Sequence, residues 1–159
     1  TLQEVVAAEA PSWRAMAAAT GEGRRVIESA GGAQMRAPVD PRPLTAEERS
    51  VVSHILRVDF PGVEELRLQL DRTRVVAPWS EGSVSVDLEV VGDAPRAPVP
   101  NGIVPVDCVV VDEDGDLFGE IILWNESGML SGLEYAWFGD HPPRSLPRVD
   151  RMITSQRVL

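Results

Sequence analysis

The sequence predicts an α+β fold, in which a two-helix hairpin packs on one face of an antiparallel β-meander of four to five strands. Two observations predict it: apolar residues recur with helical spacing from Leu44 to Leu70, and from Thr73 onward they alternate with polar residues. An Ala-rich stretch with helical character comes before both and leads into a Pro-rich linker. We therefore expect a helical arm and linker over 1–43, an α+β domain over 44–150 and a tail over 151–159.

The domain is expected to begin with two short helices. Thr45 and Glu48 have the spacing of a capping box, in which each side chain accepts a hydrogen bond from the backbone of the other. The helix behind them carries one apolar stripe and ends before the turn sequence at 59–62. A second helix is expected from about Val63 to Leu70. The tight turn between the two predicts a helical hairpin.

Strands follow the helices. The alternating pattern predicts them over residues 74–76, 84–90, 106–111, 117–124 and 129–138. Asp114-Gly115 is the strongest hairpin turn sequence in the chain, and Ser127-Gly128 closes the next hairpin. The last three strands therefore form a meander, in which each strand pairs with the next.

The two faces of this meander follow from the turns. If Asp114-Gly115 is a two-residue loop, Val111 pairs with Phe118 and Val109 with Glu120, and an even loop at the second hairpin keeps the alternation. One face is then almost wholly aliphatic and forms the core against the helices: Val106, Cys108, Val110, Leu117, Ile121, Leu123, Leu130, Ala136 and Phe138. The other face sets aromatic rings among carboxylates: Asp107, Val109, Val111, Phe118, Glu120, Ile122, Trp124, Met129, Ser131, Leu133, Tyr135 and Trp137. A one-residue change in either turn exchanges the faces along a strand.

Charge is distributed unevenly along the chain. The net charge is −10, and residues 75–143 alone carry thirteen acidic residues and one Arg, a net −12. Residues 144–159 carry four Arg and one acidic residue, a net +3. An acidic segment of this size argues against nucleic-acid binding. All fifteen basic residues are Arg, which excludes Schiff-base and P-loop chemistry because both need Lys.

The sequence also bears on the compartment. No apolar run approaches ~20 residues, so no membrane-spanning helix is expected. The N-terminus has no basic region of the kind that begins a signal peptide. Cys108 is the single cysteine, so neither an internal disulfide nor a Cys-based zinc site is expected. We expect a cytoplasmic protein without a cofactor.

Catalytic and metal-binding patterns are weak. The segment 112–116 begins like a calcium loop, but its sixth and twelfth positions are Leu117 and Leu123 instead of Gly and Glu, so we expect a solvated hairpin tip. Asp140 and His141 are adjacent in a loop, and neighbouring residues seldom orient each other as a catalytic pair. Glu134 falls on the aliphatic face, where burial would raise the pKa of its carboxyl. No spacing supports a metal site.

Several segments together resemble a family of small, acidic, uncharacterised actinobacterial proteins, a domain of unknown function, over about residues 44–147. They are Leu44–Glu48, Asp59–Gly62, Leu66-Arg67, Gln69-Leu70, Ser85–Val90, Asp114-Gly115, Gly128–Tyr135 and Gly139–Pro143. Some members of that family carry cysteines in the loop before the second strand. Here the loop is Pro78–Gly82, so the resemblance implies no metal role there. It implies no activity either.

These observations favour a non-enzymatic binding protein whose acidic, aromatic sheet face takes a basic protein partner; an immunity or antitoxin-like inhibitor of a basic toxin is its most concrete form. The partner-binding residues we expect are Asp107, Asp112, Asp114, Asp116, Glu120, Trp124, Tyr135 and Trp137. The alternative is a small enzyme or ligand-binding domain that uses Glu120, Glu134 or the Asp140/His141 pair. A third possibility is a structural module that acts through the 1–43 arm.

Overall fold

A computed structural model of the chain describes residues 40–158, and Asp40–Leu159 form one compact unit. The helical arm predicted over 1–43 lies, up to residue 39, outside the described residues. The helices are α3 (Ala46–Ile55) and α4 (Val63–Gln69), with short 3₁₀ turns η1 (Leu70–Arg72) and η2 (Val149–Arg151). The strands are β1 (Arg42–Pro43), β2 (Thr73–Pro78), β3 (Val86–Val90), β4 (Gly102–Ile103), β5 (Val106–Val111), β6 (Leu117–Glu126), β7 (Met129–Trp137) and β8 (Met152–Gln156).

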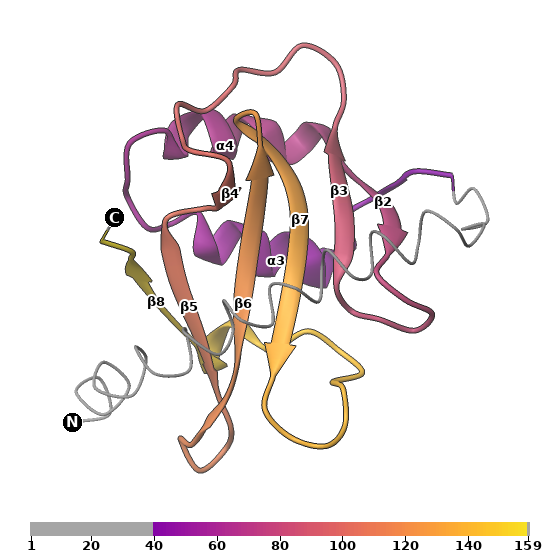
Figure 1. Cartoon of the computed structure of the whole chain (residues 1–159), viewed down its shortest axis with the longest axis vertical. Helices are drawn as coiled ribbons and strands as arrows, with labels where there is room; N and C mark the ends of the chain where they lie inside the picture. The colour runs from indigo at the N-terminus through magenta and orange to yellow at the C-terminus, as the bar shows by residue number, and fades with distance from the viewer. Residues whose placement is uncertain (1–39, 159) are drawn as a thin grey trace. The chain divides into compact units, whose positions relative to one another are not determined.

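The described part of the chain forms an α+β domain with one sheet of eight antiparallel strands (Figure 1). The strand order is β1-β2-β3-β7-β6-β5-β8, and β4 pairs with β6 beside this path. The prediction of four to five strands was therefore too low. The additional strands β1, β4 and β8 are two to five residues long. The two-residue strands β1 and β4 are too short to show a period of two, and β8, Met-Ile-Thr-Ser-Gln, does not alternate apolar with polar residues.

The capping box at the start of α3 is confirmed. The Thr45 hydroxyl accepts a hydrogen bond from the Glu48 N–H at 3.1 Å, and Glu48 Oε1 accepts one from the Thr45 N–H at 2.8 Å. Arg42 Nη1 also donates to Glu48 Oε1 at 2.8 Å. The Glu48 carboxylate therefore joins the first turn of α3 to strand β1, which comes just before it in the chain.

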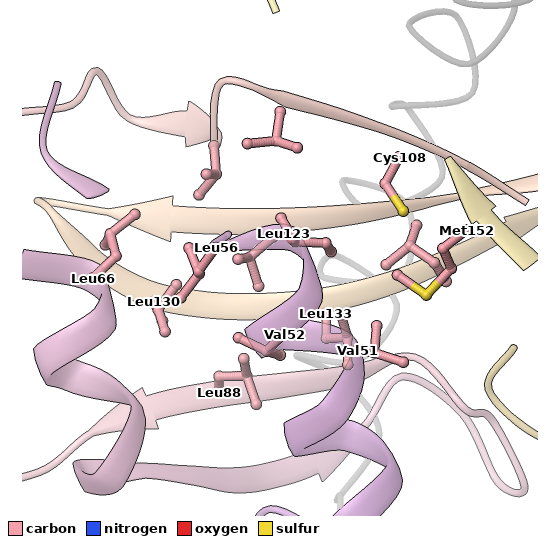
Figure 2. Close-up of a cluster of buried hydrophobic side chains, with 14 of the residues drawn as sticks. Val51, Val52, Leu56, Leu66, Leu88, Cys108, Leu123, Leu130, Leu133 and Met152 are labelled. Carbon is pink, nitrogen blue, oxygen red and sulfur yellow. The ribbon is translucent and has the colours of Figure 1, made fainter. Parts of the chain in front are cut away.

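The core lies between the two helices and one face of the sheet (Figure 2). Val51 and Val52 of α3, together with Leu66 of α4, pack on strand side chains that include Leu88 and Leu133. The predicted apolar stripe of the first helix is confirmed, because each of its four members is buried: Val51, Val52, Ile55 and Leu56.

A β-bulge in the β6–β7 hairpin corrects the predicted faces of β7. Asn125 pairs with Leu130 but Trp124 pairs with Gly132, so Ser131 is an extra residue on β7. Beyond it the alternation is reversed. Leu133 and Tyr135 belong to the core cluster, whereas Glu134 and Ala136 face away from the helices.

A second bulge lies in the β5–β6 hairpin. Val109 pairs with Glu120 as predicted, but Val111 pairs with Leu117 instead of Phe118. Phe118 is the extra residue, and its ring packs against the core at an edge-to-face angle of 62° to the Tyr135 ring. The alternating pattern placed Leu117 in the core and Phe118 on the opposite face, and both placements are wrong.

The buried amide of Gln69, on the last turn of α4, holds the β6–β7 turn in place. Its Nε2 donates to the Pro95 and Gly128 carbonyls, each at 2.7 Å, and its Oε1 accepts from the Leu130 N–H at 3.0 Å. Gln69 has no exposed surface. One side chain therefore bonds to three backbone groups, and its bonds to the Gly128 carbonyl and the Leu130 N–H are buried.

We expect Gln69→Leu to lower the free energy of unfolding by about 1–3 kcal/mol, because the Leu130 N–H would remain buried without a partner and the Gly128 carbonyl would keep only its bond from the Ala97 N–H. Chemical denaturation followed by circular dichroism measures this. Leu68→Ala is the matched control, since Leu68 is on the same helix and 65% exposed, and it should change stability by less than about 0.5 kcal/mol. Equal effects of the two substitutions would contradict the role assigned to the amide.

Candidate functional site

The sheet face opposite α3 and α4, here called the helix-distal face, carries three of the predicted site residues. Cys108, Ile121 and Leu133 point into the core. Their strand neighbours therefore point the other way: Asp107 and Val109 on β5, Glu120, Ile122 and Trp124 on β6, and Glu134 and Ala136 on β7. The structure thus places Asp107, Glu120 and Trp124 on one face, as the sequence predicts.

Two tryptophans on this face are hydrogen-bonded to carboxylates. Trp124 Nε1 donates to Glu134 Oε2 at 2.9 Å, and Trp79 Nε1 donates to Asp87 Oδ1 at 3.1 Å. All four side chains are half-buried. Each indole is held by its carboxylate in one orientation, which lowers the entropy cost of presenting a flat apolar surface.

A buried ionic cluster lies at the other side of the same face. Arg157 Nε donates to Asp107 Oδ1 at 2.8 Å, and Arg157 Nη2 lies 3.8 Å from Glu120 Oε1. Glu120 is 2% exposed and Asp107 5%. The Arg157 guanidinium, from the end of the basic C-terminal segment, therefore lies beside both buried carboxylates and offsets their negative charge.

The acidic hairpin between β5 and β6 is rigid. Asp112 Oδ1 accepts hydrogen bonds from the N–H groups of Asp114 and Asp116, each at 2.9 Å. The Gly115 N–H donates to the Asp112 carbonyl at 3.1 Å, and Gly115 has φ 84°, a left-handed conformation that suits glycine. Asp112 therefore shapes the loop, while the exposed tip consists of Glu113, Asp114 and Asp116.

Two exposed aromatic rings lie at this end of the sheet. Trp137 is 41% exposed and Phe138 39%. Trp137 pairs with Gly119, and the Phe138 N–H donates to the Phe118 carbonyl at 2.9 Å, so both lie level with the base of the hairpin. Trp137 points to the same side of the sheet as Tyr135, because the bulge at Ser131 reverses the alternation, so the prediction that Trp137 faces away from the helices is wrong. We call this end of the sheet the acidic–aromatic end; its residues are Glu113, Asp114, Asp116, Trp137 and Phe138.

Tyr135 does not belong to the surface. It is 4% exposed and lies in the core, because the bulge at Ser131 turns it toward the helices. Burial raises the pKa of Tyr135 to about 12, and the nearby Cys108 adds to the rise. The prediction that Tyr135 faces away from the helices is wrong.

The residues of the alternative, catalytic hypothesis are dispersed. Glu134 is bound to the Trp124 indole, Glu120 is buried beside Arg157, and His141 is exposed in the loop after β7. Burial raises the pKa of the Cys108 thiol to about 12, so it is not a nucleophile at neutral pH. Among residues 40–158, no three His, Cys, Asp or Glu side chains are grouped so that they could hold a metal ion.

The described residues line cavities away from the residues of the catalytic hypothesis. One, of about 340 Å³, lies between α3 and α4 and has Ser53, Leu56, Arg57, Arg67 and Leu70 in its walls. Another, of about 460 Å³, lies between the α3–α4 turn, the loop before β5 and the end of β8. Neither includes Glu120, Glu134 or His141.

Comparison of the chain with family models, curated proteins and solved structures found no match. The resemblance to an acidic actinobacterial family therefore stays a prediction. None of the helices in the described part of the chain is both long and apolar enough to cross a membrane.

Sequence reasoning missed three residues of the candidate site: Trp79, Phe138 and Arg157. Trp79 lies in a loop that has no period, although its partner Asp87 was on the polar side of an alternating strand. Phe138 was assigned to the core because the bulge at Ser131 leaves no mark in the pattern. The partner of Asp107, Arg157, is fifty residues away in the chain, and only the pairing of β8 with β5 brings the two together.

The phenol of Tyr135 should titrate with a midpoint near pH 12 in the folded protein and near 10 in the unfolded chain. Tyr135 is the only tyrosine, so the ultraviolet absorbance of tyrosinate reports on it alone. Because the folded pKa is raised, this group stabilises the fold fully below pH 10, and the contribution is lost as the pH rises to about 12. A midpoint near 10 before unfolding would contradict the buried position.

Proposed function

We propose that this domain is a binding protein that takes a basic protein partner at the acidic–aromatic end of its sheet. The observation that carries the proposal is the exposed aromatic pair, Trp137 and Phe138, beside three exposed carboxylates. Exposed aromatic rings supply buried area when a partner docks, and tryptophan is enriched among the residues that carry most of the binding energy at interfaces. The surrounding carboxylates select for a cationic partner.

Long-range charge supports the same partner. The segment that contains this end has a net charge of −12. A field of one sign speeds the association of an oppositely charged protein and fades as salt is added. The half-buried Trp124 and Glu134 lie further along β6 and β7, on the helix-distal face.

A basic toxin is the most concrete partner of this kind, and the domain would then act as its inhibitor, in the manner of an immunity or antitoxin protein. This role needs no catalytic group, which agrees with the dispersed positions of Glu120, Glu134 and His141. It needs a rigid surface, and the hydrogen bonds of Asp112 supply that at the hairpin.

The test uses a fluorescent, arginine-rich peptide as the basic probe in stopped-flow kinetics. Neutralising the tip with Glu113→Gln, Asp114→Asn and Asp116→Asn should slow association about tenfold at low salt and have little effect at high salt. Trp137→Ala should leave association unchanged and speed dissociation about tenfold, because it removes contact area.

Matched controls neutralise three exposed carboxylates elsewhere, with Glu47→Gln, Glu81→Gln and Asp93→Asn, and remove an exposed apolar side chain elsewhere, with Leu68→Ala. If the controls change the rates as much as the tip variants do, the attraction is a property of net charge alone. The proposal also fails if the wild-type chain does not bind the peptide at low salt.

A further inference from the structure

The two edges of the sheet differ in how open they are to another strand. At one edge, β1 has only two residues, Arg42 and Pro43, and follows Pro41, and proline donates no hydrogen bond. At the other edge, β8 has five residues, with the sequence Met-Ile-Thr-Ser-Gln, and it pairs with β5 without a bulge (Figure 1). It therefore carries neither the prolines, the charges nor the bulges that usually protect an edge.

The register of β8 shows which backbone groups point outward. The Arg157 N–H donates to the Pro105 carbonyl at 2.9 Å. In an antiparallel pair, alternate residues bond to the neighbouring strand, so those in step with Arg157 face β5 and the residues between them face away. Thr154 and Gln156, which pair with Cys108 and Val106, are among the latter. Their N–H and C=O groups lie on the side of β8 where no described strand pairs.

An apolar groove lies at the C-terminal end of this edge. It has a volume of about 460 Å³ and is lined by Phe60, Pro61, Pro98, Val99, Pro100, Pro105, Gln156, Arg157 and Val158. The wall of the groove is tightly packed around Gly62, because a Cβ atom on Gly62 would lie 3.0 Å from the Val99 side chain and 3.1 Å from the Pro98 ring. The groove is large enough for one bulky apolar side chain.

The acidic hairpin lies at the N-terminal end of the same edge. Arg151 Nη1 donates to the Asp112 carbonyl at 3.1 Å, so β8 begins beside the hairpin. The exposed carboxylates of Glu113, Asp114 and Asp116 outnumber this one guanidinium. A strand added to β8 would therefore have an apolar groove at one end and a negative field at the other.

We propose that an extended segment of a basic protein adds to the outer edge of β8 as a further antiparallel strand. Its first residue fills the groove with an apolar side chain, and its last residues place Arg or Lys beside the hairpin. The distance from Arg157 to Arg151 is about 20 Å for an extended chain, so a strand of six or seven residues spans it. Antiparallel pairing matches every described pair of this sheet. The inference rests on the proposed function, because the hairpin carboxylates serve both.

The probe is a synthetic peptide with leucine at its N-terminus, alternating valine and threonine in the middle and arginines at its C-terminus; a second peptide has the reverse order. Binding to the full chain is measured by fluorescence anisotropy, and amide hydrogen exchange is followed by NMR. We expect the first peptide to bind about tenfold more tightly than the second, and to slow the exchange of the Thr154 and Gln156 N–H groups. If exchange at these two groups is unchanged while the peptide is bound, the edge is not the site.

Thr154→Pro removes an outward N–H without removing a bond of the sheet, and Thr154→Val is the matched control that keeps the N–H. Thr154→Pro should weaken binding of the first peptide about tenfold, and Thr154→Val should leave it unchanged. Equal binding by both variants overturns the inference, as does concentration-dependent dimerisation that Thr154→Pro abolishes, which would assign the edge to a second copy. If Thr154→Pro does not fold, the exchange measurement on the wild-type chain decides alone. If the arginine-rich probe binds but the first peptide does not, the inference fails and the proposed function stands. If neither peptide binds and the arginine-rich probe does not bind, the proposed function is overturned.

Discussion

The buried amide of Gln69 is the interaction on which the arrangement of the sheet depends most. It is fully used: both its N–H groups and its oxygen bond to backbone groups of the 94–101 loop and of the β6–β7 hairpin. The Leu130 N–H bonds to this helix side chain, and the next residue, Ser131, is the bulge that changes the register of β7. A single polar contact between a helix and a turn thus accompanies the change of register.

The change of register decides which side chains reach the surface. Beyond Ser131, Leu133 and Tyr135 complete the core under the helices, and Glu134 meets the Trp124 indole on the helix-distal face. This reversal of the alternation is energetically favourable, because it buries the large ring of Tyr135 and leaves the Glu134 carboxylate half-exposed to water. Without the bulge, the core would contain Glu134 and lose Leu133.

The candidate surfaces gather at one end of the sheet. The rigid hairpin held by Asp112, the exposed Trp137 and the start of β8 all lie there, from three different parts of the chain. Each of these features favours binding of a partner for a different physical reason. Negative charge steers a basic protein toward the domain, exposed rings supply area to bury, and an unprotected strand edge offers backbone hydrogen bonds. Their coincidence is why a basic, extended segment is the partner that fits best.

The sequence by itself determined the elements that local physics controls: the capping box at Thr45 and Glu48, the apolar stripe of α3, the long strands β5 to β7, and the concentration of negative charge. It also placed Asp107, Glu120 and Trp124 on one face, because alternation holds within an uninterrupted stretch of strand. Only the tertiary structure decided the rest. The bulges at Phe118 and Ser131 each insert one extra residue into a strand, and the alternation of apolar and polar residues does not show where such a residue falls. Likewise β8 becomes a strand because β5 is there to pair with it, and Arg157 becomes the partner of Asp107 for the same reason.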